Sequence, residues 1–356
     1  MFSLSDLGWS DFFVEQYQRL ASSGLDPARV AEENRGLYRI LCPAGEFWAS
    51  IRGSLRHQAT TREGLPAVGD WVLVEHHPPR ATIHSVLARR TKFARKSAGD
   101  KTEQQIVAAN IDTVFLVSSL NRDFNPRRLE RYLALAWESG AQPLIVLNKA
   151  DLCAHPNEYL ESARAIAGGA PIILSSVANG EGLHELRERV RTGGTTALLG
   201  SSGVGKSSLI NALLGEELQL TAAVRPDDDR GRHTTTSRQL ISVPGGGVLI
   251  DTPGMRELHL WDASDGLETA FADIEQLARN CKFRDCRHES EPGCAVREAV
   301  AVNELEEDRL ESYHKLGREQ LFLESKQDAA LRSTRNQTFR RLSKAQNRLY
   351  RNKTLL

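Results

Sequence analysis

The stretch TTALLGSSGVGKSSLINALLG, residues 195–215, decides the fold of this 356-residue chain. Its centre satisfies the pattern G-x-x-x-x-G-K-[ST] from Gly200 to Ser207, with an apolar segment before it and a helix-like segment after it. Glycines in such a loop let backbone N–H groups turn toward phosphate oxygens, and the N-terminus of the following helix points at the same oxygens. The stretch therefore predicts a strand, a phosphate-binding loop and a helix.

Individual residues of this loop have predicted roles. Lys206 is expected to reach the β- and γ-phosphates of a nucleotide and to act in catalysis, and the Ser207 hydroxyl is expected to ligate Mg²⁺. The residues predicted to contact the nucleotide here are Gly200, Ser201, Ser202, Gly203, Val204, Gly205, Lys206, Ser207 and Ser208.

Two segments after the loop extend the same site. Asp251, in LIDTPG (249–254), ends an apolar segment 45 residues after Lys206, as does the carboxylate near Mg²⁺ in nucleotide hydrolases. Between them lies the polar segment RGRHTTTSR (230–238), in which one threonine of 234–236 would give a hydroxyl to Mg²⁺. The candidates named for this role are Thr235 and Thr236.

The segment LIVLNKADL (144–152) predicts which base the nucleotide carries. The Asp151 carboxylate can accept hydrogen bonds from guanine N1–H and from the N2 amine, which adenine does not offer. Asn148 would contact the purine edge, and the stem of Lys149 can lie over the base. One strand later, backbone N–H groups can face the guanine carbonyl from Ser175, Ser176 and Val177.

The order of these motifs differs from that of a conventional GTPase, in which the phosphate loop precedes the base-reading loop. Here the base-reading loop comes first, although the cyclic order of all the motifs is preserved. The old ends would be joined through 178–196, and new ends would open after residue 254. Circular permutation is tolerated where termini lie close together at the surface. We therefore predict a circularly permuted α/β GTPase domain with a mostly parallel sheet.

The segment before this domain changes in pattern and charge. Residues 36–98 consist of short alternating segments punctuated by Gly and Pro, which favour a small β-barrel with an OB-fold as the leading candidate. Residues 1–35 are expected to be a polar helical extension. Lys and Arg outnumber Asp and Glu by ten to five in 36–100 and by nine to one in 325–356, although the whole chain has net charge zero. Two basic regions raise the expectation of a nucleic-acid partner.

Aromatic residues of the barrel segment have two interpretations. Phe47, Trp48 and Trp71 could stack on the bases of RNA, but aromatic residues at such positions more often fill the barrel core.

Cys281, Cys286, His288 and Cys294 form the pattern Cys-x₄-Cys-x-His-x₅-Cys. Three thiolates and one imidazole suit tetrahedral zinc, and a set without a carboxylate or an open position suits a structural site. The spacing differs from that of standard zinc fingers, and buried free cysteines are the alternative interpretation.

Together these motifs resemble the RsgA family, the circularly permuted bacterial GTPases of small-ribosomal-subunit biogenesis. The resemblance covers about 36–310 and includes QQIVAANIDTVFLV (104–117) and GRHTTT (231–236). It implies an N-terminal OB-fold, a permuted P-loop GTPase domain and a helical C-terminal zinc-binding domain, with zinc at the Cys/His cluster. It also implies action on the 30S subunit and its 16S rRNA late in maturation, with GTP hydrolysis coupled to release of this protein or of another factor.

The predicted organisation has five parts. They are an N-terminal extension (1–35), the OB-fold (36–98), the GTPase domain (99–260), the zinc-binding domain (261–325) and a basic tail (326–356). Because the chain is cut after residue 254, the second switch would run directly into the zinc domain. Movement of 251–260 with the bound nucleotide could then reorient 262–310.

The residue that orients the attacking water is less obvious. Met255 stands where familiar GTPases place a glutamine, and its apolar side chain cannot orient water. His233, next to the switch threonines, is the nearest polar candidate and is our hypothesis for this catalytic role. The alternative is a loop residue without such a role.

Other function classes are less compatible with the sequence. No apolar run approaches the ~18 residues that span a bilayer, and the N-terminus lacks the basic region of a signal peptide, so a cytoplasmic protein without membrane contact is expected. The sequence shows no oligomerisation signal, and a monomer is the default expectation. The alternative function is a nucleotide-gated RNA-binding or signalling module without a ribosomal role. An ATP-dependent enzyme is opposed by Asn148 and Asp151.

Overall fold

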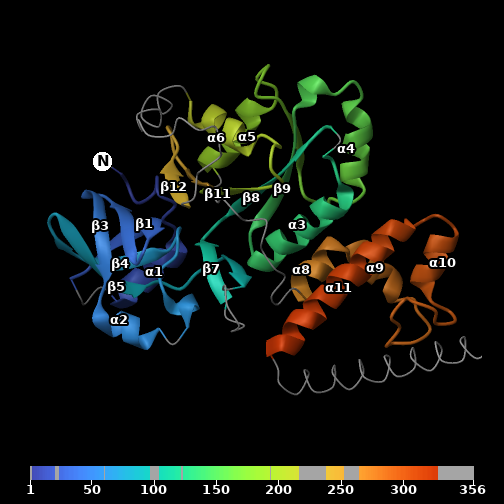
Figure 1. Cartoon of the computed structure of the whole chain (residues 1–356), viewed down its shortest axis with the longest axis horizontal. Coiled ribbons are helices and arrows are strands. Elements are labelled where there is room, and N and C mark those ends of the chain that lie inside the picture. The colour runs from blue at the N-terminus through green and yellow to red at the C-terminus, as the bar shows by residue number, and fades with distance from the viewer. Residues whose placement is uncertain are drawn as a thin grey trace, which may run out of the picture.

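The computed structural model describes residues 2–20, 24–59, 61–96, 104–121, 123–192, 194–215, 238–251 and 264–327. These residues form a β-barrel, an α/β domain and a helical unit, which follow one another across the molecule (Figure 1). The α/β domain lies between the other two parts.

The barrel has the strand order of an OB-fold, as predicted. Its strands are β1 (Asp26–Asn34), β2 (Leu37–Cys42), β3 (Gly45–Ile51), β4 (Trp71–His77) and β5 (Arg80–Val86). They pair in the order β1-β2-β3-β5-β4, and β4 pairs back to β1, which closes the barrel. The β3–β5 pair is parallel and the others are antiparallel. Between β3 and β4 lie the helix α2 (Gly53–Gln58) and the short 3₁₀ helix η2 (Arg62–Gly64).

The prediction of a helical extension over 1–35 is wrong for its second half. Helix α1 spans Asp11–Leu20, whereas Asp26–Asn34 is the barrel strand β1, so the barrel begins before the predicted boundary at residue 36. Strand β1 pairs with β2, β4 and β12 and is buried along most of its length, so it lacks the alternating pattern that reveals half-buried strands.

The α/β domain has the predicted permuted order of elements. Its strands are β8 (Thr113–Ser119), β9 (Gln142–Asn148), β10 (Ile172–Ser175), β11 (Thr195–Leu199), β12 (Gln239–Ser242) and β13 (Val248–Asp251), and its helices are α3 (Pro126–Ser139), α4 (Pro156–Arg164), α5 (Leu183–Thr192) and α6 (Lys206–Leu214). The strands are parallel in the order β10-β9-β8-β11-β13, and β12 forms the predicted antiparallel hairpin with β13. Successive residues of β8 point to opposite faces of the sheet. Leu116 lies in the cluster that includes α3, and Phe115 lies in the cluster that includes α5 and α6.

One sheet runs through both the barrel and the α/β domain. Strand β12 pairs with β1 at Gln239 and Glu32, which joins the two parts into an eleven-stranded sheet. A separate hairpin of β6 (Lys92–Lys96) and β7 (Gln104–Ala109) connects the barrel to β8 along the chain.

The buried side chain of Arg29 ties three segments together at this junction. Its guanidinium donates to the carbonyls of Gly69 (3.1 Å) and Asn110 (3.0 Å), and also to that of Leu7. It lies 5.2 Å from the ring centroid of Trp71, which is fully buried. Trp71 is therefore a core residue and not a stacking platform for RNA.

The helical unit packs on the α/β domain through α3, as Figure 1 shows. Its helices are α8 (Ser264–Ala270), α9 (Ala272–Ala278), α10 (Ala295–Ala301) and α11 (Glu307–Gln327). At Gly266, a Cβ atom would stand 2.5 Å from the carbonyl oxygen of Ala134, so glycine lets α8 approach α3 closely. Among the described helices, none has the length and apolar character needed to cross a bilayer.

Some predicted boundaries fall outside the described residues. These are the limit between the barrel and the GTPase domain (98/99), the limit between the GTPase and zinc domains (260/261), and the tail beyond residue 327. The predicted start of the tail at 326 falls within α11, which continues to Gln327.

Candidate functional site

The phosphate loop has the predicted strand–loop–helix context, between β11 and α6. A Cβ atom at Gly200 would stand 2.3 Å from the carbonyl oxygen of Val117, so the loop can lie against β8 only with glycine there. The Lys206 Nζ donates to the carbonyls of Gly200 and Ser201, both at 2.7 Å. In this arrangement the Lys206 side chain is hydrogen-bonded to the backbone of the phosphate loop.

The base-reading loop is hydrogen-bonded to the phosphate loop. The Asn148 Nδ2 donates to the Val204 carbonyl (2.8 Å), and the Lys149 Nζ donates to the Gly203 carbonyl (2.6 Å). Asn148 and Val204 are 56 residues apart in the sequence. The two motifs, which stand in the reverse of the usual order along the chain, thus form one site.

Two serines after β10 support the base-reading loop through their side chains. The Ser175 Oγ donates to Asn148 Oδ1 (3.1 Å), and the Ser176 Oγ donates to Asp151 Oδ1 (2.5 Å). The Ser176 N–H, which is predicted to face the guanine carbonyl, donates to the Glu181 carbonyl (3.0 Å) in this structure. These serines therefore orient the two side chains that would read the base.

Asp123 is a site residue that the sequence prediction missed. Its carboxylate accepts a hydrogen bond from the Ser201 hydroxyl (2.5 Å) and pairs with Arg128 (3.0 Å). A signal was present, since Asp123 closely follows β8 and the carboxyl ends of neighbouring parallel strands share one edge of the sheet.

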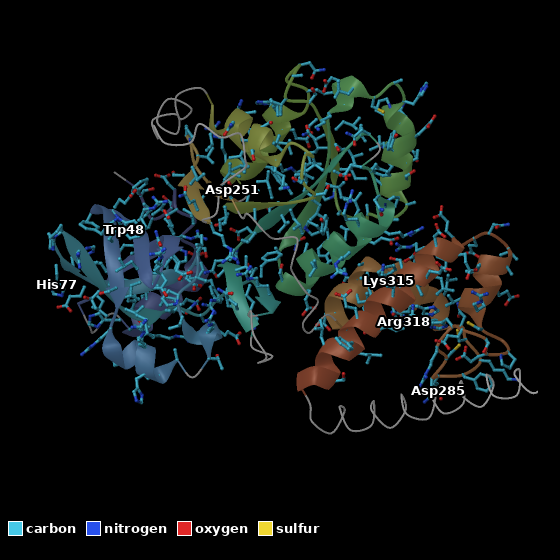
Figure 2. The ribbon with its side chains drawn as sticks, viewed as in Figure 1. Trp48, His77, Asp251, Asp285, Lys315 and Arg318 are labelled. Carbon is cyan, nitrogen blue, oxygen red and sulfur yellow. The ribbon has the colours of Figure 1, made fainter. Side chains whose placement is uncertain are left out.

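Of the predicted Mg²⁺ ligands, the structure describes Ser207 and Asp251. Ser207 lies in the first turn of α6, and Asp251 is the last residue of β13 (Figure 2). Burial raises the pKa of Asp251, and the nearby positive charge of Lys206 opposes this shift. The other predicted residues of the switches, Thr235, Thr236, His233 and Met255, lie outside the described residues.

The structure brings the Cys/His cluster together as predicted. The candidate ligand atoms of Cys281, Cys286, His288 and Cys294 all lie within 4.8 Å of one another. The His288 Nδ1 is 3.6 Å from the sulfur of Cys281 and 3.4 Å from that of Cys294, and these two sulfurs are 3.9 Å apart. Zn–S bonds of ~2.3 Å and Zn–N bonds of ~2.1 Å in tetrahedral geometry require about 3.8 Å between sulfurs and about 3.6 Å from sulfur to nitrogen. The cluster thus fits a tetrahedral metal ion.

Local contacts distinguish two residues of the cluster, Cys294 and His288. Cys294 caps the N-terminus of α10, where its sulfur accepts a hydrogen bond from the Arg297 N–H (3.4 Å). Burial lowers the pKa of His288, which favours the neutral imidazole that a metal ion requires.

Comparison with known proteins gives two family matches. The model of the RsgA GTPase family matches residues 86–261, and that of the ABC transporter family matches residues 183–349. The second match includes the phosphate loop, which many nucleotide hydrolases share, but not the base-reading loop.

Relatives extend over nearly the whole chain. The small ribosomal subunit biogenesis GTPase RsgA of Opitutus terrae is 46% identical over 97% of both chains. The protein of the same name from Streptomyces coelicolor is 44% identical over 95% of this chain and 92% of its own.

Two solved structures are also similar to this chain. YjeQ from Thermotoga maritima is similar with a TM-score of 0.63 and 27% identity, over 83% of this chain and 99% of that chain. YloQ, described as a circularly permuted GTPase, is similar with a TM-score of 0.58 and 26% identity, over 83% of this chain and 95% of that chain.

Proposed function

The chain belongs to the RsgA family of GTPases, and from this premise we propose that it acts in late maturation of the 30S ribosomal subunit. In this proposal it binds 16S rRNA and couples GTP hydrolysis to its own release or to that of another factor. The observation that carries the guanine-nucleotide part is the hydrogen bond from Asn148 to the Val204 carbonyl (2.8 Å), which joins the base-reading loop to the phosphate loop. The names of the full-length relatives support the ribosomal part.

The proposed nucleotide contacts follow the geometry of the two loops. Residues 200–208 surround the phosphates, Asp151 reads the guanine edge, and Asn148 and Lys149 brace the base-reading loop against the phosphate loop. In this assignment Ser175 and Ser176 hold the base-reading side chains, and Val177 keeps its predicted backbone contact with the guanine carbonyl.

The Ser207 hydroxyl and the Asp251 carboxylate are the described residues that would hold Mg²⁺, with Thr235 and Thr236 as the candidates in the switch. Bound Mg²⁺ neutralises charge that develops on the phosphates during phosphoryl transfer. Lys206 adds a second positive charge there, and it must leave the carbonyls of Gly200 and Ser201 to do so.

We assign the orientation of the attacking water to His233, because Met255 replaces the usual glutamine. Replacing His233 with Ala should reduce stimulated GTP hydrolysis by about 100-fold, in the range of general acid–base contributions, without changing affinity for a fluorescent GDP analogue. His57→Ala, on the exposed face of α2, is the matched control. Unchanged turnover of the His233 variant contradicts the assignment.

The proposed rRNA surface includes the barrel. Trp48 is 41% exposed and lies at the outer side of the barrel in Figure 2, where an aromatic ring is available for stacking on a base. Phe47 is half-buried and packs near His76, with ring centroids 5.0 Å apart. Trp48 is thus the residue of this group best placed to contact RNA.

The metal of the Cys/His cluster is proposed to be one structural Zn²⁺, because three thiolates and one imidazole fill a tetrahedral set and leave no open position. Metal analysis of the purified protein should give one zinc per chain. The protein is further proposed to be cytoplasmic and monomeric.

Steady-state GTP hydrolysis tests the main proposal. The rate is measured with the protein alone, with 30S subunits, and with 50S subunits as the control. We expect 30S subunits to stimulate the rate of GTP hydrolysis strongly and 50S subunits not to stimulate it. Tight GTP binding without stimulation would instead favour the nucleotide-gated RNA-binding module.

A further inference from the structure

A groove with a volume of about 520 Å³ lies between the barrel and the β6–β7 hairpin. This volume is within the range of ~300–1,000 Å³ that is common for small-ligand sites. Its walls come from the β1–β2 turn, α2, η2, both strands of the hairpin and the residue before β12. The charged residues that line it are Arg35, Arg56, Arg62, Arg95, Arg238 and Glu33.

Most of this positive charge is not neutralised by the protein. Within the described ranges, no carboxylate forms an ion pair with the arginines at positions 35, 56, 62 and 238. Other arginines of the barrel differ, since Arg39 pairs with Glu32 (3.2 Å) and Glu46 (3.1 Å), and Arg89 pairs with Asp70 (2.7 Å). The groove therefore concentrates unpaired guanidinium groups.

Arg238 contributes a buried hydrogen-bond donor to the groove. Its Nε is buried and has no hydrogen-bond partner among the described residues. Burial lowers the pKa of Arg238, the charge of Arg95 lowers it further, and the charge of Glu33 opposes both effects. A buried donor without a partner destabilises a protein unless a ligand or water supplies the acceptor. An anion in the groove would provide an acceptor for this donor and would add negative charge to that of Glu33.

We propose that this groove binds adjacent phosphate groups, which come either from an RNA backbone, in which case the inference rests on the proposed rRNA binding, or from a free oligophosphate. Guanidinium groups bind phosphate oxygens through paired, charge-assisted hydrogen bonds. Tyr38 also lines the groove, and burial raises the pKa of its hydroxyl to about 12, so it stays protonated and can donate. None of the phosphate-loop residues lines the groove, so this site is separate from the nucleotide site.

The test uses the full chain with GDP saturating the nucleotide site, so that the phosphate loop cannot bind the probes. Inorganic tripolyphosphate is titrated by calorimetry, and a labelled single-stranded RNA of about 12 nucleotides is titrated by fluorescence anisotropy. The groove variant is Arg56→Gln/Arg62→Gln, in which both side chains are exposed. The control is Arg164→Gln/Arg189→Gln, which removes the same charge from α4 and α5.

The groove variant should weaken binding of at least one probe about 10-fold or more, because two charge-assisted contacts are lost, while the control changes it less than about 2-fold. An effect on tripolyphosphate alone identifies a free oligophosphate as the ligand, and an effect on RNA identifies a backbone. Arg238→Lys, which keeps the charge but removes Nε, should weaken the same probe. Equal affinities of the groove variant and the control, or no binding of either probe, would overturn the proposal.

Discussion

The Ser176 hydroxyl donates a hydrogen bond to the Asp151 carboxylate, which is the group proposed to read the guanine base. Substitutions at these two residues therefore test base selection. Replacing Asp151 with Asn gives the site an N–H donor where guanine also presents donors, whereas xanthine presents a carbonyl. We expect affinity for GDP to fall about 100-fold and xanthosine diphosphate to become the preferred ligand, since hydrogen bonds to charged groups contribute ~1.5–3 kcal/mol each.

Fluorescence competition with the two nucleotides measures this exchange. Ser176→Ala is the matched control, because it removes the support of Asp151 but keeps the carboxylate. It should weaken GDP binding without reversing the preference. Retained preference for GDP in the Asp151→Asn protein would contradict the assignment.

A second residue-scale prediction concerns the pH dependence of stability at Asp251. Burial raises its pKa in the folded protein, so the folded state holds this proton to higher pH than the unfolded state, whose pKa is near ~3.9. Stability therefore falls as pH rises from the unfolded pKa through the folded pKa, and the loss persists at neutral pH.

Asp251→Asn removes this buried charge. The nucleotide-free variant should unfold at higher urea concentration than the wild type at pH 7, and the difference should vanish near pH 3, where both side chains are neutral. Its GTP hydrolysis should fall about 100-fold or more, because a ligand of the proposed Mg²⁺ is lost. A stability gain that is equal at both pH values would show that the charge of Asp251 is not its cause.

At the scale of residues, the sequence motifs could be predicted from the sequence. The side chains that hydrogen-bond to the motif residues could not. The expected roles of Asn148, Lys206 and the four cluster residues follow from residue type and spacing. Asp123, Ser175 and Ser176 form hydrogen bonds with side chains of other loops. The order of the strands in the sheet decides which of these loops lie next to one another. A single sequence does not state that order directly.

At the scale of elements, the strands with alternating apolar and polar residues and the strands that lie between helices were predictable. Strand β1 was not. Its sequence, DPARVAEEN, contains helix-favouring residues, and its pairing on both edges hides any alternation. The signal that was available is the turn after it. Arg35 and Gly36 have φ of 50° and 84°, as the two central residues of a type I′ hairpin turn require, and glycine at the second central position favours such a turn.

The contact between α3 and the helical unit supports an element-scale prediction. Glu130 on α3 is fully buried and accepts from Arg309 (2.8 Å) and Arg127 (2.5 Å), and Arg309 also donates to Asp273 (2.6 Å). Replacing Arg309 with Met leaves Glu130 buried with one partner fewer. Breaking a buried pair from one side costs ~3–5 kcal/mol, so a loss of about 3 kcal/mol in unfolding free energy is expected.

A double-mutant cycle measured by urea unfolding separates this pair from general packing. Glu130→Met/Arg309→Met should cost less than the sum of the two single changes, because the double variant buries no unpaired charge. Additive costs would mean that the ion pair does not couple α3 to α11.

At the scale of the whole molecule, the single sheet places the proposed phosphate groove next to the nucleotide site. Gln239 of β12 pairs with Glu32 of the barrel and also with Asp251 of β13. Arg238 precedes Gln239 directly, so only one strand separates a ligand in the groove from the proposed Mg²⁺ ligand. The sequence motifs revealed the nucleotide site, whereas the groove and the pairing of β1 with β12 became apparent only in the fold.

The N-terminal segment extends this junction, and its role gives the last prediction. Leu7 accepts a hydrogen bond from Arg29, the rings of Trp9 and Trp71 are 4.6 Å apart, and those of Phe13 and Trp71 are 5.9 Å apart. Residues 2–20 therefore cover the buried Trp71 and complete the shell around Arg29. An N-terminal segment with this role contributes to the stability of the barrel and of its junction with the α/β domain.

Neighbouring phenylalanines of α1 test this role, because Phe13 is 2% exposed and Phe12 is 39% exposed. Phe13→Ala should lower the unfolding free energy by about 3–5 kcal/mol, as expected for a buried aromatic residue, and Phe12→Ala should lower it by less than about 1 kcal/mol. Urea unfolding followed by tryptophan fluorescence reports on Trp9 and Trp71 at the junction itself. If α1 were only an appendage, both variants would unfold like the wild type. A large loss for Phe13→Ala alone would instead make α1 part of the core that joins the barrel to the GTPase domain.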